Sequence, residues 1–134
     1  MSVTPERLRA LPLFAALSDE EISRLCRSFE EKPASAGTRL TLEGASGYSF
    51  FVIERGAVEV TRGDQVLETL RVGDFFGEAA ILTGERRNAT VTASEDTDLL
   101  VMFGTEFRVL ERDMPEAAEK IRQTMLDRDA RRAS

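Results

Sequence analysis

The sequence predicts an α+β fold in which an antiparallel β-roll (a double-stranded β-helix or jelly roll) is flanked by N-terminal and C-terminal helices. The middle of the chain holds several short apolar or alternating segments separated by glycines, a pattern typical of short antiparallel strands. Segments with helical spacing of apolar residues lie before and after it. Because 134 residues suffice for one sizeable core, we expect a single domain over residues 1–134.

Helices are expected over about residues 1–32. A leucine-rich stretch suggests a short helix that is interrupted near Pro12, because proline cannot continue a helix. A second helix is expected to begin at Ser18, since Ser18 and Glu21 form the Ser-x-x-Glu pattern of a capping box. The apolar residues after this box repeat with helical spacing: Ile22, Leu25, Cys26 and Phe29. We therefore interpret Cys26 as a core residue and not as a reactive thiol.

The β-roll is expected over about residues 38–103, after a break in the pattern from Pro33 to Gly37. Strands are predicted where residues alternate or form short apolar runs: residues 38–42, 50–53, 57–61, 65–67, 89–93 and 99–103. Gly63 and Asp64 form a candidate two-residue hairpin turn, because glycine adopts a positive φ without steric cost.

Helical patterns return over about residues 105–131. A break between two helices is expected at Met114 and Pro115, because proline favours the first turn of a new helix. The predicted apolar stripe of the last helix consists of Ala117, Ala118, Ile121 and Met125.

The composition narrows the possible functions. The net charge of −6 argues against nucleic-acid binding by this domain, since phosphate backbones attract clustered lysines and arginines. No histidine is present, which excludes histidine-dependent nucleophiles and multi-histidine metal sites. We therefore expect no enzyme, no metal and no cofactor. Cys26 is the only cysteine, and neither a signal-like segment nor a run of roughly 18 apolar residues is present, so we expect a soluble cytoplasmic protein.

The segment from Phe75 to Val91 interrupts the strands and combines a carboxylate with two arginines. Gly77 would let the backbone approach a ligand closely, and a short helix beginning at Glu78 would direct its first amides at an anion. Arginine suits a phosphate, and a carboxylate, which only accepts hydrogen bonds, suits a hydroxyl such as those of ribose. These groups describe a sugar phosphate or nucleotide. A surface loop with an ordinary Glu–Arg pair would explain the composition equally well.

Residues Phe76 to Leu82, followed by Arg87 to Val91, resemble the phosphate-binding cassette of the cyclic nucleotide-binding domain family in content and spacing. This family includes the catabolite activator protein and the regulatory subunit of protein kinase A. The resemblance covers nearly the whole chain and includes further segments: Leu13 to Glu21, Glu43 to Val60, Val72 to Phe75 and the helices after Phe103. It implies a β-roll that binds a cyclic nucleotide.

The resemblance also implies a role for individual residues. Glu78 would accept a hydrogen bond from the ribose 2′-hydroxyl, while Gly77 and the amides that follow Glu78 would add backbone donors. Arg87 would pair with the cyclic phosphate, whereas Arg86 would face solvent. The ligand-binding set that the cassette implies is Phe76, Gly77, Glu78, Ala79, Ala80, Arg87, Asn88, Ala89 and Thr90.

Base selectivity and the lid over the base stay open at this point. Asn88 occupies a position where family members that prefer cGMP often carry threonine, and those that prefer cAMP alanine or serine. We favour cAMP over cGMP because it is the commoner ligand in similar single domains. Arg122, Met125 or Arg128 could cover the purine; alternatively, Met125 packs on the roll and both arginines are solvated.

The predicted function is a cyclic nucleotide sensor, a regulatory domain in signal transduction in which ligand capture draws the C-terminal helices inward. An effector protein, a fused effector domain and a homodimer are all compatible partners. A β-roll that binds no nucleotide and serves as a scaffold for protein–protein interaction is the alternative. A metal-binding β-roll enzyme is a third class, against which the absence of histidine argues.

Overall fold

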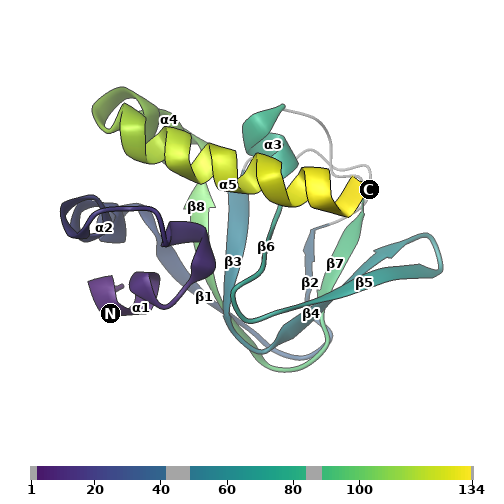
Figure 1. Cartoon of the computed structure of the whole chain (residues 1–134). Coiled ribbons are helices and arrows are strands. Elements are labelled where there is room, and N and C mark those ends of the chain that lie inside the picture. The colour runs from purple at the N-terminus through teal and green to yellow at the C-terminus, as the bar shows by residue number, and fades with distance from the viewer. Residues whose placement is uncertain (1–2, 42–48, 84–88, 134) are drawn as a thin grey trace.

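The computed structural model describes residues 3–41, 49–83 and 89–133, and it confirms a β-roll flanked by helices (Figure 1). One antiparallel sheet has the order β1 (Glu30–Ala34), β8 (Thr97–Phe103), β3 (Ser49–Arg55) and β6 (Phe75–Phe76). The other has the order β2 (Arg39–Thr41), β7 (Thr90–Ala93), β4 (Ala57–Arg62) and β5 (Gln65–Arg71). The α-helices are α1 (Pro5–Arg9), α2 (Asp19–Leu25), α3 (Glu78–Leu82), α4 (Gly104–Asp113) and α5 (Pro115–Ala133). Two short 3-10 helices are η1 (Pro12–Phe14) and η2 (Cys26–Ser28).

The sheet that contains β3 and β8 is buried on both faces. Along β3, Phe50 and Val52 belong to the apolar cluster beneath the helices, whereas Phe51 and Ile53 belong to the cluster inside the roll. Strands buried on both faces carry continuous apolar runs, which explains why this stretch does not alternate with polar residues. The molecule therefore has two cores, one on each side of this sheet. We call them the helix-side core and the roll interior.

The N-terminal helices form as predicted, and α2 begins at the capping box. The Glu21 amide donates to Ser18 Oγ at 3.1 Å, and the Ser18 amide donates to Glu21 Oε1 at 2.8 Å. The α-helix ends at Leu25 and tightens into η2, so that Cys26 is half-buried against the helix-side core. Burial raises the pKa of the Cys26 thiol. Cys26 thus packs against the core as predicted, although it is only partly buried.

The prediction of helices up to about residue 32, with the roll starting near residue 38, is wrong at this boundary. The roll begins at residue 30 with β1, which pairs with β8. Pro33 lies within β1 opposite Asp98. Proline removes one ladder hydrogen bond, and β1 is an edge strand of its sheet, which is where that loss is tolerated.

The other elements follow the predictions closely. Gly63, with a φ of +59°, lies in the two-residue turn between β4 and β5, since Arg62 pairs with Gln65. The break at Met114 separates α4 from α5, and the predicted stripe of α5 is fully buried. Among the described residues, no helix combines the length and apolarity needed to span a membrane.

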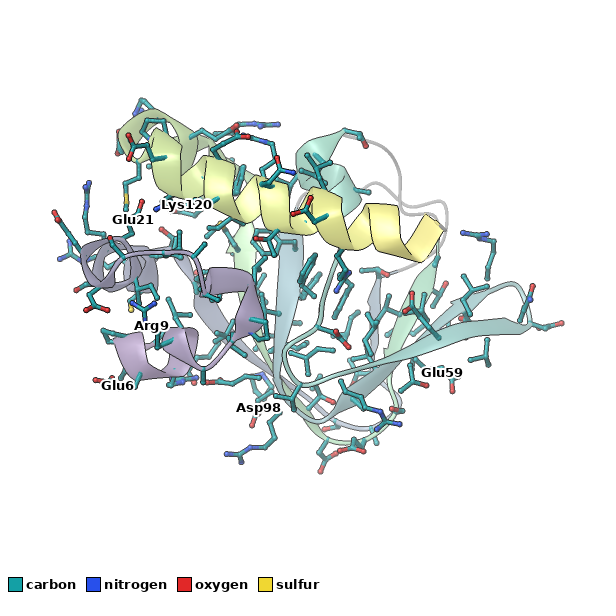
Figure 2. All side chains as sticks on the ribbon, in the orientation of Figure 1. Glu6, Arg9, Glu21, Glu59, Asp98 and Lys120 are labelled. Atoms are coloured by element: carbon teal, nitrogen blue, oxygen red, sulfur yellow. The ribbon has the colours of Figure 1, made fainter. Side chains whose placement is uncertain are left out.

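An ion pair connects the start of α5 to α2. Lys120 Nζ lies 2.9 Å from Glu21 Oε1 (Figure 2). The pKa of Glu21 is lowered chiefly by the Ser18 amide and secondly by Lys120, because both donate hydrogen bonds to the Glu21 carboxylate. The same carboxylate therefore caps α2 and ties α5 to it.

Gly56 is the one residue between β3 and β4. Its φ is +95°, and a Cβ atom there would lie 2.6 Å from both Asp96 O and Thr97 Oγ1. Gly37 has a similar φ of +90°, yet a Cβ atom at Gly37 would meet nothing within 4 Å. The two glycines thus share the backbone strain that a side chain would suffer, and only Gly56 adds a steric clash.

We predict that Gly56→Ala lowers the free energy of unfolding by about 3 kcal/mol or more, through left-handed strain plus the forced displacement of Asp96 and Thr97. Gly37→Ala, which introduces the strain alone, should cost about 1 kcal/mol. Urea unfolding followed by circular dichroism measures both. Equal losses in the two variants would contradict the steric account.

Candidate functional site

A one-residue turn places Glu78 at the start of α3. Strand β6 pairs with β3, with Phe76 opposite Phe51 and Phe75 opposite Val52. Gly77 follows with a φ of +84°, a left-handed conformation that favours glycine, and α3 begins at the next residue. The predicted short helix at Glu78 is thereby confirmed. The turn holds Glu78 at the junction of strand and helix, where its side chain is enclosed.

Glu78 is the one buried carboxylate among the described residues, with 7% of its surface exposed. Burying a charge is costly unless it is paired and hydrogen-bonded. The partner is Arg128 from α5, whose Nη2 donates to Glu78 Oε1 at 3.2 Å. Both side chains are nearly enclosed, at 13% exposure for Arg128 and 10% for Glu78.

Arg128 also contacts the strand before the turn. Its guanidinium carbon lies 3.5 Å from the centroid of the Phe75 ring, and Nη2 donates to the Phe75 carbonyl. Phe75 belongs to the helix-side core, whereas Phe76 belongs to the roll interior. Arg128 therefore reaches Glu78 from the helix side, and α3 lies behind the C-terminal part of α5 in Figure 1.

Of the two predicted residues at the start of β7, Ala89 lies in the same interior as Phe76. Ala89 is buried there, and Thr41 Oγ1 donates to its carbonyl at 3.2 Å. Thr90 begins β7, and its carbonyl accepts from Thr61 Oγ1 at 3.5 Å. The Phe76 ring stacks on Phe51, with centroids 4.8 Å apart. The structure thus brings Phe76 and Ala89, from the two parts of the predicted cassette, into the same apolar interior.

Arg86, Arg87 and Asn88 lie outside the described residues, as do Glu43 and Gly44. Ala79 and Ala80 lie within α3, which follows Gly77 as predicted. The roles assigned to the two arginines and to Asn88 stay predictions.

The three lid candidates on α5 occupy different environments. Met125 is fully buried in the helix-side core, as the packing alternative predicted. Arg122 lies over the Phe107 ring at 5.5 Å and pairs with Glu111 of α4 and with Glu119. The expectation that both arginines are solvated is wrong, because each has a carboxylate partner and an aromatic ring beneath it.

The Arg128–Glu78 pair and the contact with Phe75 were not predicted from the sequence. One signal could have indicated the pair: a buried carboxylate requires a cationic partner, and the last helix carries several arginines. Nothing in the local pattern distinguishes Arg128 from Arg122, since only the placement of α5 in the fold decides which arginine reaches Glu78.

Comparisons with known proteins agree with this architecture. The sequence model described as "Cyclic nucleotide-binding domain" matches residues 31–113. The catabolite activator protein of Thermus thermophilus, a solved structure, superposes with a TM-score of 0.81 at 28% identity, over 91% of this chain and 59% of that chain.

Three curated relatives illustrate the contexts in which similar sequences occur. A cyclic nucleotide-gated potassium channel of Rhizobium etli is 36% identical over 119 residues, which is 89% of this chain and 33% of the channel. The cGMP-dependent protein kinase isozyme 1 of Drosophila melanogaster is 34% identical over 121 residues, covering 84% of this chain and 16% of the kinase. The cAMP-dependent protein kinase regulatory subunit of Eremothecium gossypii is 35% identical over 104 residues, covering 77% of this chain and 23% of the subunit.

The chain thus spans about a third or less of the length of these relatives. The family match covers most of the roll, together with the turn at Gly77, the buried Glu78 and α4. This chain belongs to the cyclic nucleotide-binding domain family.

Proposed function

We propose that the chain is a regulatory module that binds cAMP in preference to cGMP and that binding repositions its C-terminal helices. The observation that carries this proposal is the buried Glu78, which follows Phe76 of the roll interior by two residues and is paired with an arginine from α5. A carboxylate enclosed at this point supplies a hydrogen-bond acceptor where a ligand hydroxyl would enter. The pairing gives α5 a direct connection to the same group.

The proposed contacts assign one chemical feature of the ligand to each part of the cassette. Glu78 accepts a hydrogen bond from the ribose 2′-hydroxyl, and backbone amides from Gly77 into α3 add donors. Arg87 pairs with the cyclic phosphate, whose single negative charge one guanidinium neutralises. Ala89 and Thr90 add contacts beside the phosphate, and Phe76 contributes apolar surface from the roll interior. The family is regulatory, and the proposal includes no catalytic step.

The preference for cAMP is the finer part of the proposal. Relatives that are cAMP-dependent and cGMP-dependent are about equally similar to this chain. Asn88 offers both a donor and an acceptor at the position where threonine accompanies cGMP in the family. Asn88 lacks the hydroxyl of threonine. We propose that cGMP therefore has one hydrogen-bond partner fewer in this site than in cGMP-preferring relatives, so that cAMP binds more tightly.

The proposed mechanism is a population shift of α5. The helix begins after the break at Met114 and is tied near its start by Lys120 to Glu21, so its start is anchored. Its C-terminal part is held by Arg128, which donates hydrogen bonds to Glu78 and to the Phe75 carbonyl. A nucleotide that binds at Glu78 changes the partners of that carboxylate and therefore changes the free energy of the docked helix.

The output of the module depends on what α5 contacts. We propose that residues 1–134 act as a single domain in the cytoplasm. We propose that an effector protein, a fused effector domain or a second copy of the chain responds to α5. The greater length of the relatives is compatible with a fused domain. A scaffold that binds no nucleotide is the competing function. Its partner binding would be unaffected by substitutions at Glu78 and Arg87.

We predict that cAMP raises the melting temperature of the protein by roughly 10 °C at 100 times its dissociation constant, since that concentration stabilises a site by about 2.7 kcal/mol. Arg87→Ala should weaken cAMP binding ~100-fold or more, because it removes a bidentate charge-assisted contact. Arg86→Ala is the matched control and should bind as the wild type does. If Arg86→Ala caused the greater loss, the assignment of the two arginines would be reversed.

Base selectivity should change with the residue at position 88. Asn88→Thr should shift the affinity ratio about fivefold towards cGMP, the effect of one additional neutral hydrogen bond. Asn88→Ala should leave the preference for cAMP in place. Competition binding with both nucleotides measures the ratios. An unchanged ratio in Asn88→Thr would remove position 88 from base selection.

Hydrogen exchange tests the proposed mechanism. On addition of cAMP, the amides of residues 115–128 should exchange more slowly, because the docked position of α5 gains population. The hairpin turn at residues 62–65 serves as an internal control and should not change. Exchange in α5 that stays the same at saturating nucleotide would contradict the coupling.

A further inference from the structure

We propose that Thr41 is a positioning residue for the second part of the cassette: its hydroxyl holds the start of β7, where Ala89 and Thr90 are proposed to contact the cyclic phosphate. This inference rests on the proposed function, since it concerns the same site. It adds a residue that the predicted ligand-binding set does not contain, and it assigns that residue a role that requires no contact with the nucleotide.

The hydroxyl of Thr41 is buried and bonded to the backbone. With 8% of its surface exposed, Thr41 is one of three buried polar or charged residues in the described parts of the chain. Its Oγ1 donates a hydrogen bond to the Ala89 carbonyl at 3.2 Å. Ala89 directly precedes β7 and is buried in the roll interior. Because a buried hydroxyl has no water to bond to, it favours a fixed protein partner. The contact therefore restrains the chain where the cassette enters the strand.

A β-bulge directs Thr41 to this carbonyl. Between Arg39 and Thr41, strand β2 advances two residues while its partner β7 advances one, which makes Leu40 the extra residue. In a regular strand, neighbouring side chains point to opposite faces. Here Leu40 packs against the roll interior, and Thr41 beside it is buried as well. Bulges re-aim side chains in this way and are frequent beside functional sites.

Strand β7 lies between β2 and β4, so its start is contacted from both sides (Figure 1). From β4, Thr61 Oγ1 donates to the Thr90 carbonyl at 3.5 Å, and Thr61 is only half-buried. A separation of 3.5 Å lies at the upper limit for a hydrogen bond. The contact from Thr41 is the shorter and the better enclosed of the two. We therefore assign the positioning role to Thr41.

The restraint acts on the peptide that joins Ala89 to Thr90. The carbonyl of one residue and the amide of the next belong to one planar unit, so fixing the Ala89 carbonyl fixes the orientation of the whole peptide. Restricting groups before a ligand binds reduces the entropy that binding costs. The effect of Thr41 should therefore be confined to contacts with the phosphate, whereas a loss of stability would weaken the binding of every part of the nucleotide.

Thr97 provides a matched control away from the cassette. It is also buried, and its hydroxyl donates to the Glu95 carbonyl at 2.9 Å and accepts from the Ala57 amide at 3.3 Å. Ala57 begins β4, whereas the residue of β4 that pairs with Thr90 lies near the other end of that strand. Thr97→Val therefore removes an equivalent buried hydroxyl without touching the start of β7.

The test uses the two phosphorothioate diastereomers of cAMP, in each of which sulfur replaces one exocyclic oxygen of the phosphate. Because sulfur is the weaker hydrogen-bond acceptor, the wild type should prefer cAMP over at least one diastereomer. Thr41→Val removes the hydroxyl and keeps the shape of the side chain. It should reduce the preference for cAMP over one diastereomer about fivefold, the effect of one neutral hydrogen bond. Thr41→Ser, which keeps the hydroxyl, and Thr97→Val should both retain the wild-type preference in competition calorimetry.

The other outcomes overturn the inference. Equal weakening of all three nucleotides by Thr41→Val would show that Thr41 serves stability alone, and unchanged affinities would show that the start of β7 does not need the hydroxyl. A Thr41→Ser variant that behaves like Thr41→Val would assign the effect to the methyl group. Wild-type protein that binds cAMP without preference over either diastereomer would overturn the inference and leave nucleotide binding intact. Binding of no nucleotide would instead refute the proposed function.

A measurement on the wild type covers the case in which Thr41→Val does not fold. In NMR spectra of protein with isotope-labelled threonine, the Thr41 methyl signal should shift when the more weakly bound diastereomer replaces cAMP at saturation, because Thr41 bonds to the peptide that is proposed to contact the phosphate. The Thr97 methyl signal is the internal reference and should not move. A Thr41 signal that is the same with both nucleotides would overturn the inference.

Discussion

The buried ion pair of Glu78 and Arg128 is the constraint on which this structure depends. Glu78 follows Phe76 of the roll interior by two residues and pairs with an arginine that lies on Phe75 of the helix-side core. An unpaired buried charge at this position would be strongly destabilising. Arg128 compensates the charge of Glu78, and it belongs to α5, which begins at Pro115. The position of α5 therefore determines whether the charge of Glu78 has its partner. A group that also serves a ligand hydroxyl would make that coupling a means of regulation.

The doubly buried sheet makes this arrangement possible. Because β3 and β8 direct alternate side chains to the two cores, the helices pack on one face while the other face lines the roll interior. Phe75 and Phe76 divide in the same way, and Gly77 then turns the chain into α3, which begins with Glu78. One strand of two residues thus separates the surface on which the helix docks from the proposed nucleotide site.

Local signals in the sequence predicted much of the fold, and long-range packing decided the rest. The capping box at Ser18, the turn at Gly63 and the break before Pro115 are determined by neighbouring residues, and all three were predicted correctly. Strand β1 was missed because Pro33 indicates a break, and only the edge position makes it tolerable. The Arg128–Glu78 pair joins residues 50 positions apart, and no local pattern selects Arg128 over Arg122. The roles of Arg87 and Asn88 stay predictions that rest on the family resemblance.

The central claim is that this roll binds a cyclic nucleotide at Glu78 and that cAMP is its ligand. Isothermal titration calorimetry of the unmodified chain, with cAMP and cGMP in separate titrations, tests it most directly. The account predicts saturable binding of one nucleotide per chain, with the lower dissociation constant for cAMP. Titrations that release no saturable heat with either nucleotide would contradict it and would favour the protein-interaction scaffold.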